Sequence, residues 1–163
     1  MAHFNIRVRY EDCDNNYVIY NSIHHMTTSS NCDDIIWMDF SDNDIYCLPI
    51  LPKGLRELLC CNCKLSRIRE LPDTLLFLNC SYNSLTSIYT LPPRLRTLGC
   101  AHNNLCSLPK LPSRMESLWC NNNNIKTLDN LPNSLEFLHC QNNPRMKKIP
   151  PIPYNMNMVN FRW

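Results

Sequence analysis

Residues 51–150 read LPKGLRELLCCNCKLSRIRE, LPDTLLFLNCSYNSLTSIYT, LPPRLRTLGCAHNNLCSLPK, LPSRMESLWCNNNNIKTLDN and LPNSLEFLHCQNNPRMKKIP, one unit after another. Positions are numbered from the leading Leu of each unit. Every unit then has Pro at position 2, Leu or Met at position 5, Leu at position 8 and Cys at position 10, and four of the five have Asn at position 13. A fixed period of this length is typical of repeat proteins, in which successive units stack and bury a shared core.

Within each unit, positions 8 and 10 alternate with positions 7, 9 and 11, which is the period of a β-strand. The strands of successive units would stack in parallel about 4.8 Å apart. Pro at position 2 removes a backbone donor and favours extended or polyproline II segments or tight turns over an ordinary helix. The repeat therefore predicts a solenoid with a curved parallel β-sheet on its concave face and extended, polyproline II or 3-10 turns on its convex face.

Degenerate copies of the unit flank the five regular ones, which is usual at the ends of a solenoid. Residues 35–50 keep the apolar positions without the leading Leu-Pro, and residues 152–163 follow after one extra residue. We predict a solenoid over residues 35–163 with about seven strands, the last one incomplete. Residues 1–34 are expected to form a cap. Its alternating segment HFNIRVRY (residues 3–10) and YVIYNSI (residues 17–23) would pair as a β-hairpin over the first repeat.

The pattern LPxxLxxLxCxxNxLxxL resembles the leucine-rich repeat, in its short proline-containing class. That class is familiar from effectors that bacterial pathogens secrete into host cells and from large DNA viruses. The resemblance covers residues 35–163, and it implies a protein-interaction module that acts on a host protein. Ubiquitin-ligase effectors of this class add a large catalytic domain after the repeats. We expect no such activity here, because no residues remain to supply that domain.

The composition indicates the cellular compartment and the classes of partner that the chain can bind. The chain has 163 residues and 11 Cys, and its formal net charge is +2. An odd number of Cys without an apolar leader segment indicates reduced thiols in a cytoplasmic or host-cytosolic compartment. The low net charge argues against a nucleic-acid partner, and no apolar run reaches the about 20 residues of a membrane span.

Two repeat positions are interpreted as structural. Position 10 holds Cys in every regular unit, and an aromatic residue replaces it at the two ends, so these thiols are expected to pack as small buried hydrophobes and to bind no metal. Position 13 is expected to form a ladder of Asn hydrogen bonds, weaker at the unit where Cys63 replaces Asn. The residues concerned are Phe40, Cys60, Cys80, Cys100, Cys120, Cys140 and Phe161 for position 10, and Asn43, Asn83, Asn103, Asn123 and Asn143 for position 13.

Candidate binding residues lie on the expected concave face, where side chains at positions 7, 9, 11 and 12 would point outward. Rings exposed beside small polar groups are typical of binding hot spots. Gly99 lies between the aromatic residues and could allow a partner to approach closely. The alternative is that adjacent rings merely pack on one another. The candidate partner-binding residues are Trp37, Phe77, Tyr82, His102, Trp119, Phe137 and His139.

We predict no catalytic residues and no cofactor. His102 and His139 lie two repeats apart, no carboxylate stands beside either on that face, and no phosphate-binding glycine loop is present. The favoured function is non-catalytic binding of a partner protein. One alternative is a self-assembling structural component: the last strand would pair with a second copy as a homodimer, helped by an acidic N-terminal and a basic C-terminal end. The other is a thiol or metal enzyme, which predicts bound zinc or a rapidly alkylated Cys61.

Overall fold

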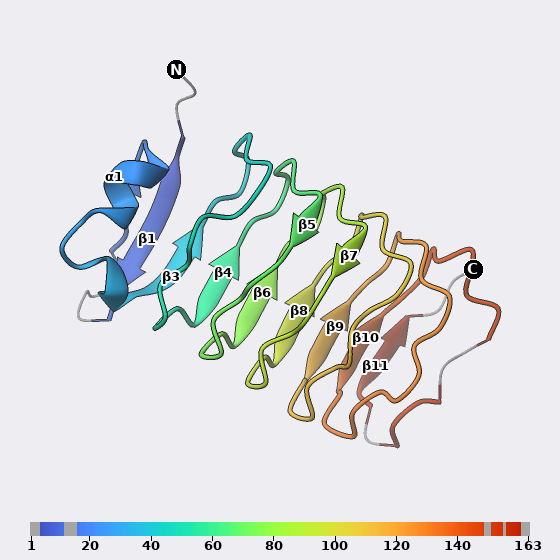
Figure 1. Cartoon of the computed structure of the whole chain (residues 1–163). Coiled ribbons are helices and arrows are strands. Elements are labelled where there is room, and N and C mark those ends of the chain that lie inside the picture. The colour runs from blue at the N-terminus through green and yellow to red at the C-terminus, as the bar shows by residue number, and fades with distance from the viewer. Residues whose placement is uncertain (1–3, 12–15, 149–150, 155, 161–163) are drawn as a thin grey trace.

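The computed structural model describes residues 4–11, 16–148, 151–154 and 156–160. Its main feature is a sheet of nine strands in the order β11-β10-β9-β8-β6-β4-β3-β1-β2. Figure 1 shows the successive turns stacked side by side along one axis. The parallel strands, one from each turn, are β3 (Ile35–Asp39), β4 (Glu57–Leu59), β6 (Phe77–Asn79), β8 (Thr97–Gly99), β9 (Ser117–Trp119), β10 (Phe137–His139) and β11 (Met158–Asn160).

Neighbouring turns pair in strict register, so a repeat position lies beside the same position of the next turn. Leu58 pairs with Leu78, and Leu78 pairs with Leu98. The side chains at positions 5, 8 and 10 are buried in all five regular units, and the Cys60, Cys80, Cys100 and Cys120 side chains are fully inaccessible. Phe40 fills position 10 at the N-terminal end and is also fully buried, whereas Phe161 lies outside the described residues. This confirms that the Cys positions belong to the core.

Two antiparallel strands cover the N-terminal side of the stack, as the alternating pattern predicted. β1 (Ile6–Tyr10) pairs with β3, and β2 (Val18–Tyr20) pairs with β1. The second strand is shorter than expected. Its sequence suggested an extended segment through Ile23, but the chain turns at Ser22, whose side chain accepts a hydrogen bond from the His25 amide and caps the short helix α1 (Ile23–Thr27). The 3-10 helix η1 (Cys32–Asp34) then leads into β3.

The return path from one main strand to the next is extended, as Pro at position 2 predicted. In each regular unit the amide at position 5 donates to the carbonyl of the Pro, which closes a tight turn; the Leu75–Pro72 bond is 3.0 Å long. Two neighbouring return paths also pair with each other through β5 (Arg67–Ile68) and β7 (Ser87–Ile88), which form a second, parallel sheet. No residue pattern in either return path predicts this pairing. In the described part of the chain, no helix has the length and apolarity needed to span a bilayer.

The Asn side chains at position 13 form the predicted ladder. The Asn103 amide nitrogen donates to the carbonyls of Cys80 and Cys100, each at 3.1 Å, and its oxygen accepts from the Leu85 amide at 2.9 Å. The same bonds recur at Asn83, Asn123 and Asn143. At Cys63 the acceptor is missing, and the amide of Ile45 turns instead to the Asn43 carbonyl at 2.8 Å. The ladder is therefore interrupted at the unit where Asn is replaced.

A candidate binding surface on the open face of the sheet

Side chains at positions 7 and 9 of the main strands point away from the core and form what we call the open face. Strict register gives this face two rows of in-line neighbours. In the position 9 row, Asn79 lies beside Gly99 and Gly99 beside Trp119. In the position 7 row, Phe77 lies beside Thr97, and Ser117 lies beside Phe137. Because the two rows hold different residues, the open face has a distinct composition at each turn.

The structure places all seven candidate residues on this face or on the turns that follow its strands. Tyr82 is exposed, with 58% of its surface accessible. The other six are half-buried, so most of the rings are more covered than the sequence suggested. Since neighbouring strands are so close, each ring is shielded by the side chains of the adjacent turns.

Three of the seven candidates come together around one hollow of about 250 Å³. Tyr82, His102 and Trp119 line it, together with Asn79, Ser81, Gly99, Ala101 and Asn121. The other four, Trp37, Phe77, Phe137 and His139, are not part of its lining. This hollow is the best-defined feature of the open face.

The turn that follows each main strand explains why this hollow is unusual. Position 12 adopts a left-handed backbone conformation in six successive turns, occupied by Asp42, Asn62, Tyr82, His102, Asn122 and Asn142. Asn, Asp and His are enriched in that conformation, whereas a bulky side chain such as that of Tyr82 adopts it at a conformational cost. Tyr82 (φ 57°) and His102 (φ 53°) are the two bulky exceptions. The abundance of Asn and Asp at position 12 is the sequence signal for this turn.

The two exceptional rings support each other. The Tyr82 and His102 rings stack with their centroids 4.2 Å apart and their planes 10° from parallel. The side-chain amide nitrogen of Asn122 lies 3.1 Å from His102 Nε2, and Asn122 Oδ1 accepts from Asn142 at 2.9 Å. The Asn122 oxygen is turned toward Asn142, so the Asn122 amide nitrogen faces the imidazole of His102. The string of contacts fixes the orientation of both rings.

The absence of a side chain at Gly99 leaves room for the side chain of Asn79 on the neighbouring strand. A Cβ atom at Gly99 would lie 2.7 Å from Asn79 Oδ1, which itself accepts a hydrogen bond from the Ser81 amide at 3.2 Å. The glycine thus allows the Asn79 side chain to fold over the strand. Gly99 also lines the hollow. We expected Gly99 to let a partner approach closely. Its contact with Asn79 gives it a second, structural role.

Two further candidate residues, Trp37 and His139, have contacts with other side chains on the open face. The guanidinium carbon of Arg9 lies 4.4 Å from the centre of the Trp37 ring, and Arg9 also approaches Glu57 at 3.8 Å. Trp37 is thus covered by the N-terminal strand β1. The rings of Trp119 and His139 are 6.3 Å apart in a tilted arrangement. Rings therefore pack on one another at Tyr82 and His102 and, less closely, at Trp119 and His139, whereas Trp37 packs against a guanidinium group.

The thiols of position 10 lie in the core. Burial raises the pKa of the Cys140 thiol to about 11, and it raises those of Cys60, Cys100 and Cys120 well above their usual range. Cys61 is half-buried, and desolvation raises its pKa as well. Within the described residues, no group of three His, Cys, Asp or Glu side chains is arranged to hold a metal ion.

The acidic N-terminal end is partly neutralised within the fold. Asp39 is buried and forms an ion pair with Arg7 of β1, and Asp44 pairs with Lys64 of the next turn at 2.8 Å. Asp42 accepts a hydrogen bond from Asn62 at 2.8 Å. The acidic run therefore contributes less free charge than its sequence suggests.

We compared the sequence and the fold with those of known proteins. No protein-family model and no curated protein matches the sequence. Among solved structures, the fold is similar to YopM from Yersinia enterocolitica WA-314, with a TM-score of 0.70, 32% identity, and coverage of 74% of this chain and 27% of that one. It is also similar to a Shigella effector leucine-rich-repeat domain, with a TM-score of 0.64, 31% identity, and coverage of 65% and 49%.

The chain thus spans about a quarter of the length of YopM and about half of that of the Shigella domain. The shared features are those that the sequence predicted: a parallel sheet with one strand per turn and return paths that contain little helix. The chain is therefore a leucine-rich-repeat solenoid, with a fold shared by the repeat domains of bacterial effectors.

Proposed function

We propose that the chain is a non-catalytic interaction module that binds a partner protein through the hollow lined by Tyr82, His102 and Trp119. The observation that carries the proposal is the presence of two bulky rings at left-handed turn positions that hold Asn or Asp in the neighbouring turns. Strained conformations that persist in a fold often mark functional sites. A stacked, partly exposed pair of rings beside a Trp also has the composition of an interface anchor.

Binding without catalysis is supported by the chemistry of the open face. Catalysis by a Cys–His pair requires the two groups to lie within hydrogen-bond reach and the thiol to ionise readily. The thiols of position 10 are buried with raised pKa values, and the lining of the hollow contains no carboxylate. The ring of His102 is instead engaged by Tyr82 and Asn122.

The similarity to effector repeats supports a host-cell protein as the partner and the cytoplasm as the compartment. The cysteines also favour a reducing compartment. The described chain holds ten of them as free thiols. Buried thiols of this kind pack as apolar groups and have no structural need of disulfide pairing.

Site-specific photo-crosslinking tests the proposal. A photoreactive phenylalanine analogue is placed at Asn121, which lines the hollow, and at Tyr89, which is exposed on the return path beyond β7. We expect a crosslinked partner from position 121 and none from position 89. The crosslink should disappear in a Tyr82→Asn/His102→Asn variant and persist in a Tyr89→Asn control. A partner captured only from position 89, or one that is insensitive to the double variant, would overturn the proposal.

We propose self-association through the C-terminal strand as a second candidate function. Among the described strands, β11 pairs only with β10, and Met158 on β11 is 47% exposed. A strand with one unpaired edge can pair with a second copy. Light scattering across a range of protein concentrations tests this, since a dimer must increase with concentration. A monomer throughout that range contradicts it.

A further inference from the structure

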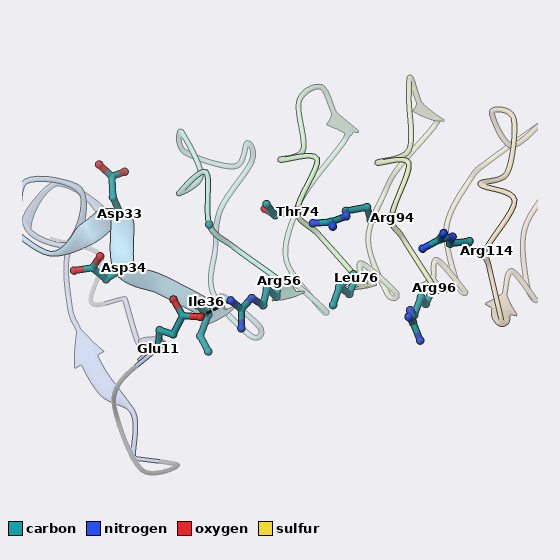
Figure 2. A pocket seen from close by; sticks show the side chains of 11 residues that line it. Glu11, Asp33, Asp34, Ile36, Arg56, Thr74, Leu76, Arg94, Arg96 and Arg114 are labelled. Atoms are coloured by element: carbon teal, nitrogen blue, oxygen red, sulfur yellow. Dashed lines mark hydrogen bonds and ion pairs between the residues drawn. The ribbon is translucent and has the colours of Figure 1, made fainter.

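A second surface lies at the opposite ends of the main strands from the hollow. It is a depression of about 420 Å³. Glu11, Asp33 and Asp34 line one end, where Arg56 pairs with Glu11, and Arg94, Arg96 and Arg114 line the part further along. Figure 2 shows the acidic side chains near η1 and the arginines spread along the following turns. The depression therefore has an acidic end and a basic end.

The arginines differ in how they are neutralised. Arg56 forms an ion pair with Glu11, and Arg96 lies 3.1 Å from Glu116. Within the described part of the chain, Arg94 and Arg114 take part in none of the ion pairs. Both are exposed, and in Figure 2 both guanidinium groups point back toward the preceding turn. Two like charges at the same position of adjacent turns repel each other, so an anion between them would be stabilised.

The repeat position of these two arginines has a structural role in other turns. Arg94 and Arg114 stand at position 4, where two other regular units have a hydroxyl. Thr74 Oγ1 lies 2.8 Å from the Leu55 carbonyl, and Ser134 Oγ lies 2.7 Å from the Met115 carbonyl, so each hydroxyl ties its turn to the preceding one. At Arg94 and Arg114 this tie is replaced by an unpaired charge. An unpaired charge that stands in two adjacent turns, at a position where a hydroxyl can serve the fold, is a sign of function.

The acidic end limits what the site can bind. Asp33 and Asp34 are exposed on η1, and a Cβ atom at Gly54 would lie 3.2 Å from the Asp33 carbonyl oxygen, which places η1 against position 4 of the first regular unit. Arg94 is two turns further along, or about 10 Å at the usual strand spacing. A long polyanion such as a nucleic acid would be repelled at the acidic end. A short ligand with a negative and a positive group would satisfy both ends.

We propose that this depression binds a phosphorylated peptide segment, with the phosphate ester between Arg94 and Arg114 and a basic side chain at Asp33 and Asp34. A phosphate ester carries close to two negative charges and three acceptor oxygens, so it can engage two guanidinium groups at once. An extended peptide rises about 3.3 Å per residue, so the two groups would be about three residues apart. The site is separate from the hollow on the open face and does not depend on the function proposed for it.

Fluorescence anisotropy with short labelled peptides tests the proposal. The probe has phosphoserine and arginine three positions apart and is made in both sequence orders, since the depression does not fix the peptide direction. The comparison peptides replace phosphoserine by serine or by glutamate, or arginine by glutamate. We expect one order of the doubly charged probe to bind at least about tenfold more tightly than each comparison peptide, as charge-assisted hydrogen bonds predict. Equal binding of the phosphoserine and serine peptides, or equally effective competition by single-stranded DNA, would overturn the proposal.

Matched protein variants separate binding from folding. In Arg94→Thr/Arg114→Ser, each turn regains a position 4 hydroxyl, so we expect probe binding to fall about tenfold while the Tm is unchanged or higher. The control Arg67→Thr/Arg69→Ser removes the same charge from exposed residues outside the depression and should leave binding intact. An Asp33→Asn/Asp34→Asn variant should lose the preference for arginine over glutamate in the probe. Undiminished binding by the first variant, or equal loss in the control, would contradict the site.

Discussion

At the scale of single residues, the side-chain amide at position 13 is the clearest link between sequence and fold. Each Asn satisfies backbone groups of two turns that would otherwise be buried without partners. Cys63 interrupts this series, although its thiol donates to the Phe40 carbonyl at 3.2 Å. We predict that Cys63→Asn stabilises the protein by about 1 kcal/mol, since Ile45 would regain a side-chain acceptor. Chemical denaturation measures this. Asn103→Ala is the opposite control, expected to cost about 3 kcal/mol. A destabilised Cys63→Asn protein would contradict the ladder as described.

Gly99 has no room for a side chain, because Asn79 lies against it. A Cβ atom there meets Asn79 Oδ1 at 2.7 Å, so Gly99→Ala should destabilise the protein by about 1–2 kcal/mol through steric overlap. Truncation of the neighbour should relieve the overlap, so the Asn79→Ala/Gly99→Ala double variant should be more stable than additivity predicts. Thermal or chemical unfolding of the four proteins measures the coupling. Additive effects would show that Gly99 is required for another reason.

Residue roles inside the core could be predicted from the sequence, whereas those of Tyr82 and His102 in the turn could not. Leu at position 8, Cys at position 10 and Asn at position 13 recur in nearly every unit, and a recurring small or apolar residue has one simple place in a stacked coil. Position 12 varies from Asp to Tyr, and its shared property is a left-handed backbone conformation. A conformational property of this kind is hidden when the residues that share it differ chemically.

At the scale of the strands, the column of thiols predicts a loss of stability in alkali. Burial raises the pKa of Cys63 and Cys140 to about 11, from an ordinary value of 9.0, and raises the pKa of Cys60 well above it. The unfolded chain therefore releases these protons first. The stabilisation is fully present below pH 9 and is lost as the pH rises through 11. The Tm, measured from pH 8 to pH 11, should stay level up to about pH 9 and then fall.

A variant identifies the cause of this alkaline loss. Cys140→Ala removes one titrating thiol, so its Tm should depend less steeply on pH than that of the wild-type protein, even though its Tm at pH 8 is lower. Cys106→Ala is the matched control, because Cys106 is exposed. Equal pH dependence in all three proteins would contradict the role given to the buried thiols.

The elements themselves were predictable to different degrees. Leu-Pro and the strand period fix the main strands and the extended return paths. The helix α1 depends on a single capping contact from Ser22, which is too local to separate from a continued strand in the sequence. The pairing of β5 with β7 depends on how closely two return paths approach, which follows from the assembled stack and from no residue pattern in either path.

At the scale of the whole molecule, strict register makes one unit removable. Deletion of residues 91–110 excises one complete turn, and β6 can then pair with β9 in the same register. We predict a folded protein with a reduced Tm, because the stack loses one interface between neighbouring turns. Circular dichroism during thermal unfolding measures this. Deletion of residues 91–100 is the control. It removes the main strand and leaves half a turn, so it should prevent cooperative folding. Equal behaviour of the two deletions would contradict a stack of independent turns.

The candidate site was predictable in location and only partly in membership. The sequence assigned seven residues to one face, and the structure gathers Tyr82, His102 and Trp119 around a hollow. The repeat pattern does not distinguish Trp37 from these three residues. The side chain that covers Trp37 is Arg9, which belongs to β1 and so lies outside the repeats. The arginine depression was missed because its residues belong to positions 4 and 6 of different turns and to η1, which only the assembled fold brings together.

Recognition by Tyr82 and His102 is tested with the Tyr82→Asn/His102→Asn protein and two measurements on the same sample. One is the Tm, and the other is affinity for the partner that the position 121 crosslink identifies. Asn suits the left-handed turn, which offsets the lost stacking, so we predict a free energy of unfolding within about 0.5 kcal/mol of wild type or higher. Affinity should fall at least about tenfold. A large drop in Tm, or undiminished affinity, would show that the two rings serve the fold and not recognition.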